Sequence, residues 1–172
     1  MIDRQLVIKF QNGEQEAFDQ LVKKHYQETQ NLFIRLSGNS MDANDLCQET
    51  FIRVYHSLKK FKSESKFSTW LYRIAINVFN SYHRKLKVRR VLSFEEESEI
   101  AKVEDPNNSR EVDPELWDAI KALPKKQKMI ITLRVFQELP FKDISVILNI
   151  SENSSKVNYH HAIKNLKKKV KE

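Results

Sequence analysis

The chain has 172 residues and a formal net charge of +7, with 31% charged and 40% hydrophobic residues. Only two glycines and four prolines occur, which favours an all-α fold, and the length allows one large or two small domains. The single cysteine excludes an internal disulfide and fits a cytoplasmic location. The N-terminus lacks an apolar signal core and no apolar run approaches about 18 residues, so we expect neither export nor a membrane span.

The charge is distributed unevenly along the chain. Residues 1–91 carry 16 Lys/Arg against 9 Asp/Glu, residues 92–116 carry 2 against 9, and residues 117–172 carry 12 against 5. This pattern suggests two modules that face a polyanion, joined by a segment that avoids it. Two solvated basic domains with a charged linker are the alternative explanation.

Amphipathic helices are predicted throughout the first basic block. The first runs from residue 14 to 36 and ends before Gly38, which suits a helix C-terminus. The second runs from about residue 42 to 58 and the third from about residue 68 to 86, with a polar loop over residues 59–66 between them. The side chains expected to point inward from the second and third helices are Cys47, Phe51, Val54, Tyr55, Leu58, Leu71, Ile74, Ala75, Val78, Tyr82 and Leu86.

Residues 92–113 show no sustained helical period and contain acidic clusters, so we expect a flexible linker there. Helical periodicity returns after Pro114, and a further helix is predicted over about residues 125–136.

A helix-turn-helix is predicted at the end of the chain. Residues 141–148 form a short amphipathic helix, Asn149 and Ile150 a tight turn, and Ser151 caps a second helix. The apolar stripe of the second helix consists of Tyr159, Ala162, Ile163, Leu166 and Val170. Because the second helix of this motif lies in the DNA major groove, the sequence predicts DNA as a partner.

No catalytic or metal-binding motif is evident in the sequence. The five histidines are scattered except for His160 and His161, which as neighbours on a helix point about 100° apart and make a poor metal site. Cys47 lies on an inward stripe and is expected to be packing rather than a redox sensor. We therefore expect neither enzyme activity nor a metal or other cofactor.

Three further motifs resemble those of one protein family. Residues 42–51, DANDLCQETF, resemble the D-A-x-D-L-x-Q-E-x-F signature of bacterial sigma factors. Residues 67–77, FSTWLYRIAIN, are similar to the F-x-T-W-L-Y-R-I-A-x-N run of the extracytoplasmic-function (ECF) branch, and residues 122–127, ALPKKQ, to the L-P-x-x-Q opening of the second domain. With the helix-turn-helix, these motifs occur in family order and span almost the whole chain.

The resemblance implies a promoter-specificity subunit of bacterial RNA polymerase with no catalysis of its own. It implies a helical domain over residues 1–91 that binds core polymerase and the −10 element, an acidic linker over residues 92–113, and a domain over residues 114–172 that binds the −35 element. In relatives the linker threads toward the RNA exit path, whereas a plain tether is the alternative. The implied partners are core RNA polymerase, promoter DNA and an inhibitory anti-sigma factor, with no small-molecule substrate.

The resemblance also implies three groups of site residues. The core polymerase-binding group on the second helix, for which an ordinary solvated helix face is the alternative, is Asp45, Leu46, Gln48, Glu49 and Arg53. The −10 group is Lys62, Ser63, Ser65, Asn77, Ser81 and Arg84. The −35 group is Ser154, Lys156, Asn158, His160, His161 and Lys164. Asn158 can read adenine, and Lys156 can reach guanine or phosphate.

Some positions depart from the family pattern or admit a second reading. Asn149 replaces a common turn glycine, and Ser155 stands where an apolar residue is usual. Phe61 and Phe67 bracket the polar loop and could stack on a flipped base, but core packing is the expectation for both, as it is for Trp70.

Two other functions fit parts of the sequence. A stand-alone helix-turn-helix regulator would normally need a dimer, but no heptad or extra dimer helix is available, and it leaves residues 45–51 unexplained. The other is a protein-interaction adaptor for which DNA is incidental. Tight duplex binding by the free chain would favour the regulator, and failure to program polymerase would favour the adaptor.

Overall fold

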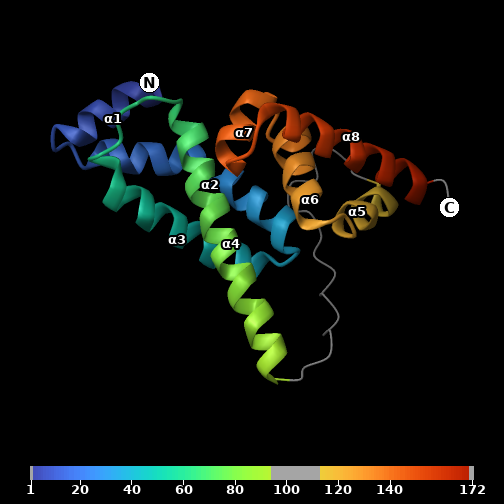
Figure 1. The fold of residues 1–172 in the computed structure, drawn as a ribbon. Coiled ribbons are helices and arrows are strands. Elements are labelled where there is room, and N and C mark those ends of the chain that lie inside the picture. The colour runs from blue at the N-terminus through green and yellow to red at the C-terminus, as the bar shows by residue number, and fades with distance from the viewer. Residues whose placement is uncertain (1, 94–112, 171–172) are drawn as a thin grey trace.

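The computed structural model describes residues 2–93 and 113–170, and every regular element within these ranges is a helix (Figure 1). The N-terminal half, residues 2–93, consists of α1 (Asp3–Gln11), α2 (Glu16–Ser37), α3 (Ser40–Leu58) and α4 (Phe67–Ser93). The C-terminal half, residues 113–170, consists of α5 (Pro114–Lys121), α6 (Lys125–Ile131), the π-helix η1 (Thr132–Phe136), α7 (Phe141–Leu148) and α8 (Glu152–Lys169). The expected all-α fold is therefore confirmed, whereas most of the predicted linker lies outside the described residues.

Local signals set several helix ends, and those at Gly38 and Asn149 lie where the sequence predicts them. Gly38 ends α2 in the left-handed conformation, with φ at 71°. The Asn39 side chain caps α3 by accepting hydrogen bonds from the backbone nitrogens of Met41 at 2.8 Å and Asp42 at 3.2 Å. Asn149 adopts φ of 53° between α7 and α8, so it takes the left-handed conformation that a turn glycine would supply.

Four features of the fold differ from the prediction. The helix α1 was not predicted, because it is only nine residues long and buries just Leu6, Val7 and Phe10, too few for a clear period. The helix α4 extends to Ser93, about two turns beyond its predicted end. The last turn of the helix expected over residues 125–136 is the π-helix η1. Residues 92 and 93, which were assigned to the linker, belong to this longer α4.

Two side chains that were expected to point inward are exposed. Tyr55 is 39% exposed because it packs at the edge of the core against the rings of Phe10 and Phe18, where its hydroxyl donates to Gln15 at 3.1 Å. Val170 is 46% exposed because it follows the last turn of α8, where no other described helix covers it.

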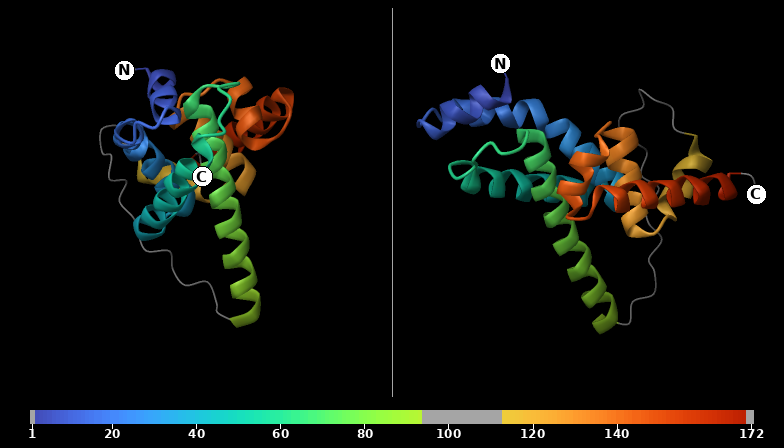
Figure 2. Two further views of the ribbon diagram at one scale, coloured as in Figure 1. Left: turned by 90° about the vertical axis from the view of Figure 1, so that its left-hand side faces the viewer. Right: turned by 45° about the horizontal axis from the view of Figure 1, so that its top comes forward.

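One hydrophobic core runs through both halves. Ile130, Leu133, Ile144 and Ile147 of the C-terminal half pack in the same cluster as the buried residues of α1 to α4, and α7 lies against α4. A smaller cluster beneath α5 includes Trp117 and joins α5, α6 and α8. Figures 1 and 2 show α6 and α7 lying beside α2 and α4, so the two halves are docked against each other.

The docking covers a second apolar stripe on α4. Tyr72, Ile76 and Phe79, which the sequence analysis assigned to neither face, are all less than 5% exposed. The Tyr72 hydroxyl donates to the side-chain oxygen of Gln137 at 2.7 Å, and the guanidinium of Arg35 stands 4.4 Å from the centre of the Phe136 ring. These contacts connect α4 and α2 to the end of η1.

Candidate nucleic-acid interface

The helix α3 presents the face that was predicted to bind polymerase. Asp45, Gln48, Glu49 and Arg53 are exposed, and Ile52 adds an exposed apolar side chain between them. Arg53 donates to the Glu49 carboxylate at 2.7 Å, an ordinary i,i+4 pair on a helix surface.

Leu46 does not belong to this face. Its side chain is 6% exposed and lies in the core, because its position on α3 faces the rest of the N-terminal half. Met41, which the sequence analysis did not single out, is 77% exposed at the start of α3. Its large apolar side chain between the polar residues Ser40 and Asp42 was the sequence signal for it.

A hydrogen bond of a half-buried tyrosine ties α3 to α4. The Tyr82 hydroxyl donates to the Asp42 carboxylate at 2.6 Å, and burial, followed by this hydrogen bond and the Asp42 charge, raises the pKa of Tyr82. The motif of residues 42–51 on α3 is therefore anchored on α4, the helix that carries the predicted −10 residues Asn77, Ser81 and Arg84.

The polar loop between α3 and α4 presents its side chains to solvent. Lys62 and Ser63 are exposed, Ser65 is half-buried, and Ser63 adopts φ of 56°. The Gln11 amide nitrogen donates to the carbonyls of Leu58 at 3.0 Å and Phe61 at 2.9 Å, which fixes the start of the loop.

The aromatic side chains around this loop form a cluster. Phe67 is 4% exposed, while Phe61 and Trp70 are half-buried and stack with ring centroids 4.5 Å apart. This packing is the role that was expected for all three.

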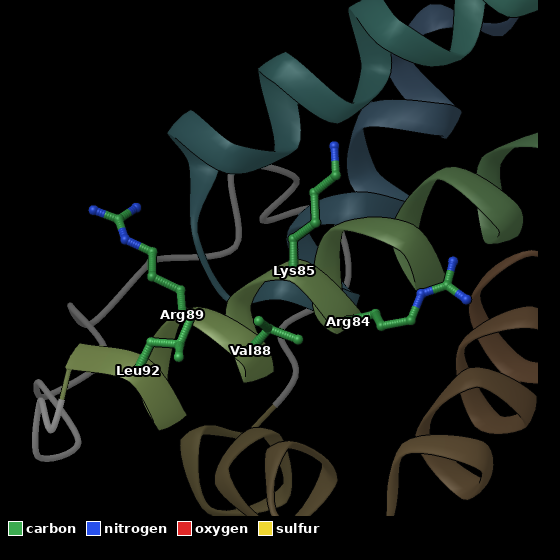
Figure 3. A pocket seen from close by; sticks show the side chains of 5 residues that line it. All are labelled: Arg84, Lys85, Val88, Arg89 and Leu92. Carbon is green, nitrogen blue, oxygen red and sulfur yellow. The ribbon is translucent and has the colours of Figure 1, made fainter.

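The outer face of α4 carries the rest of the predicted −10 group. Asn77 and Arg84 are exposed, Ser81 is half-buried, and the Arg84 guanidinium donates to the Ser81 hydroxyl at 3.4 Å. Further along the helix, a shallow groove of about 460 Å³ is lined by Arg84, Lys85, Val88, Arg89 and Leu92 (Figure 3). The basic residues between positions 84 and 90 were a sequence signal for this part of α4, although the helix was predicted to end at residue 86.

The helices α7 and α8 form the predicted helix-turn-helix. The Ser151 hydroxyl accepts a hydrogen bond from the Ser154 backbone nitrogen at 3.0 Å, as the predicted cap requires. Ser155 is fully buried, and its hydroxyl donates to the Ser151 carbonyl at 3.3 Å, which satisfies a polar group where the family usually has an apolar one.

The predicted −35 group lies along α8. Lys156, His160, His161 and Lys164 are exposed, whereas Ser154 and Asn158 are half-buried. Lys156 pairs with Glu152 at 2.8 Å, and the Asn158 amide nitrogen donates to the Ser154 carbonyl at 2.8 Å. The same amide nitrogen also donates to the Ser154 hydroxyl at 3.4 Å, and the Asn158 oxygen can accept from a base edge. His160, Lys164 and Lys167 help to line a shallow groove of about 350 Å³ on this helix.

The remaining chemistry of the described residues is limited. Cys47 is buried, and burial raises the pKa of its thiol to about 12. Within residues 2–93 and 113–170, no group of three His, Cys, Asp or Glu side chains could hold a metal ion. None of the described helices is long and apolar enough to cross a membrane.

Comparisons with known proteins agree with this arrangement. Residues 21–89 match the family model of sigma-70 region 2, and residues 114–166 match that of sigma-70 region 4. The chain is 33% identical over 159 residues to the RNA polymerase sigma-H factor of Pseudomonas aeruginosa, covering 85% of this chain and 82% of the relative. It is 31% identical over 161 residues to the ECF RNA polymerase sigma-E factor of Haemophilus influenzae, covering 87% and 85%.

Solved structures share the fold. The sigma factor RpoE, in complex with the anti-sigma factor NepR from Bartonella quintana, matches with a TM-score of 0.81 and 22% identity over 91% of this chain and 98% of that chain. CnrH, in complex with the cytosolic domain of CnrY, matches with a TM-score of 0.72 and 22% identity over 98% and 97%. From its two matching regions and its sequence relatives, the chain belongs to the sigma-70 family and is an RNA polymerase sigma factor of the ECF type.

Proposed function

We propose that this sigma factor binds core RNA polymerase through α3, reads the −10 element with the N-terminal half and reads the −35 element with α8. The observation that carries the proposal is the order of the region 2 and region 4 matches along a chain that aligns with its sigma-factor relatives over most of their length. The protein supplies specificity to the polymerase in the cytoplasm and has no catalysis of its own. The domains assigned to these roles are residues 1–91 and 114–172.

The central experiment is gel filtration with bacterial core RNA polymerase, followed by run-off transcription of a genomic library. We expect co-elution and transcripts whose promoters share one −10/−35 pair. A chain that fails to co-elute when purified free of any inhibitor would favour the regulator or adaptor functions instead.

The polymerase contact is assigned to the exposed part of α3, without the buried Leu46. Because Gln48 and Glu49 are exposed, replacing both with Ala should abolish initiation without changing the helical circular dichroism or the melting temperature. The matched control replaces Asp19 and Gln20, an exposed acid–amide pair on α2, and should initiate normally. An unchanged transcript yield from the α3 variant would refute the assignment.

The −10 contact is assigned to the loop and the outer face of α4. Reading a melted strand needs exposed polar groups that can meet unstacked bases and backbone phosphates. Lys62, Ser63 and Ser65 supply such groups from the loop, and Asn77, Ser81 and Arg84 supply them from the helix. Asn77→Ala should weaken the binding of holoenzyme to a pre-melted promoter that has the intact −10 element. The same variant should weaken binding less when the −10 element of that promoter is altered.

The −35 contact is assigned to α8. Each good base contact contributes on the order of 1–3 kcal/mol of discrimination, so Asn158→Ala should change the −35 preference and leave the −10 preference unaltered. Transcription from promoters altered at either element measures both preferences. Equal loss at both elements would contradict this role.

An anti-sigma factor is the proposed inhibitory partner. Two proteins of the same fold were solved in complexes, the sigma factor RpoE with the anti-sigma factor NepR and CnrH with the cytosolic domain of CnrY. We expect such a partner to cover the exposed α3 face, so the Gln48 and Glu49 variant should also bind it more weakly, as measured by competition with core polymerase.

A further inference from the structure

The docking of the two halves brings positive charges from α4 and α6 to one seam. We define the seam cluster as the cationic and titratable side chains that meet there. Its members are His83, Arg84, Lys87, Arg90, Lys125 and Lys128. Lys125 and Lys128 of α6 join the four α4 residues only when the C-terminal half lies against α4.

Ring contacts locate the seam. The Lys125 ammonium lies 5.7 Å from the centre of the Phe79 ring, and that ring lies 6.0 Å from the ring of His83. Phe79 is 4% exposed, so the start of α6 sits directly on α4 at this point. Figure 3 shows the Arg84 side chain extending away from Lys85 and Arg89, toward the helices of the C-terminal half.

The charges of the cluster act on one another. The pKa of His83 is lowered by burial and then by the charges of Lys125, Arg90, Lys128 and Lys87. Burial followed by the charge of Arg84 lowers the pKa of Lys125, and burial also lowers the pKa of Lys128. The positive groups of α4 and α6 therefore share one electrostatic field.

Carboxylates come near this field at Arg90, which acts on the Tyr82 hydroxyl together with Asp42 and Asp45. None of the six side chains forms an ion pair with a carboxylate of residues 2–93 or 113–170. Electrostatic repulsion among positive charges that lack ion-pair partners opposes docking of the two halves, and a bound anion would reduce this repulsion.

We infer that the seam cluster binds a ligand carrying linked phosphates, and that this ligand stabilises the docked arrangement of the two halves. Arg and Lys side chains are the usual phosphate ligands in proteins, and a cluster spread over two helices exceeds the reach of a single phosphate. Val88 and Leu92 line the groove of Figure 3, which shares Arg84 with the seam cluster but none of its other five members, so the apolar surface that a peptide helix would need lies beside the seam and not within it. This inference goes beyond promoter recognition, and the variants that test it leave intact Arg84, the member of the cluster that is also assigned to the −10 contact.

The test is a calorimetric titration of the full chain with sodium tripolyphosphate at low ionic strength. The seam variant is Lys125→Gln with Lys128→Gln, and the matched control is Lys167→Gln with Lys168→Gln, which removes the same charge from the exposed end of α8. We expect wild type and control to bind similarly and the seam variant to bind at least about tenfold more weakly, a factor that corresponds to one lost strong contact. Equal weakening in both variants would overturn the inference, because it would indicate general surface attraction.

Two further measurements test the seam itself. Lys87→Gln with Arg90→Gln removes two charges from the α4 side and should cause a comparable loss, whereas no loss would show that the site is not shared between the halves. Tripolyphosphate should also narrow the distribution of distances between fluorescent labels on α3 and α8 in the wild type. An unchanged distribution would refute stabilisation of docking.

Other anions distinguish the source of the phosphates. A mixed-sequence single-stranded oligonucleotide that binds more tightly than tripolyphosphate, with the same loss in the seam variant, would assign the site to a nucleic-acid backbone. The reverse order would assign it to a free oligophosphate. A glutamate oligomer of equal charge that binds as well as tripolyphosphate, with the same loss, would overturn the assignment to phosphate.

Discussion

The hydrogen bond between Tyr72 and Gln137 provides a direct measure of whether the two halves are docked. These residues lie on α4 and just after η1, and they are 65 positions apart in the chain. The hydroxyl of Tyr72, a 2% exposed side chain, lies 2.7 Å from the Gln137 oxygen and 3.2 Å from the Glu28 carboxylate. Burial and the neighbouring Glu28 charge raise the pKa of Tyr72, so the hydroxyl remains a donor at neutral pH.

Tyr72→Phe keeps the ring packing and removes only this hydroxyl. A buried hydrogen bond contributes about 1 kcal/mol net, and an acceptor left without a donor adds to the loss, so we expect the free energy of unfolding to fall by about 1–2 kcal/mol. Gln137 is half-buried, and water can replace part of its lost partner. Gln137→Leu should therefore cost about as much or less, and the two changes together should show a coupling energy of about 1 kcal/mol.

The assay is urea denaturation of the wild type, both single variants and the double variant. Their free energies of unfolding form a double-mutant cycle whose coupling term exists only if the two side chains meet. The control cycle pairs Tyr82→Phe with Gln137→Leu, because the Tyr82 hydroxyl bonds to Asp42 within the N-terminal half. Additive effects in the Tyr72 cycle, within about 0.3 kcal/mol, would refute the docked arrangement and the contacts inferred from it.

Three further outcomes are expected. Burial raises the pKa of the Cys47 thiol to about 12 from an ordinary 9.0, so iodoacetamide at pH 8 should label this thiol only in urea, and rapid labelling of the native protein would contradict its burial. The free energy of unfolding should decrease as the pH rises above 9.0, because only the unfolded state then ionises this thiol. Asn39→Ala removes the α3 cap and should lower the free energy of unfolding in urea by about 1 kcal/mol, whereas Ser40→Ala, at the exposed first residue of the same helix, should cost less than about 0.5 kcal/mol. Gly38→Ala, at φ of 71°, should lower the melting temperature through a cost of about 1 kcal/mol, and Gly38→Asn should lower it less; an unchanged melting temperature in the alanine variant would argue against the left-handed helix end.

Local features of this protein were predictable from its sequence. The α7 helix, the left-handed Asn149 and the Ser151 cap were all predicted and are confirmed by the structure. Each of them depends on residues within a few positions, since caps and turns are made by neighbouring backbone groups. The family motifs were equally visible, because they are contiguous runs of residue types.

Contacts between distant segments were decided only by the tertiary structure. The periodicity of α4 indicated one inward stripe, but Tyr72, Ile76 and Phe79 are buried on a second face because the C-terminal half covers it. The exclusion of Leu46 from the α3 surface was likewise not predictable from its position in a motif. A helical period shows that a face is apolar, whereas the segment that covers that face is set by non-local packing, which also determines where the charges of the two halves meet.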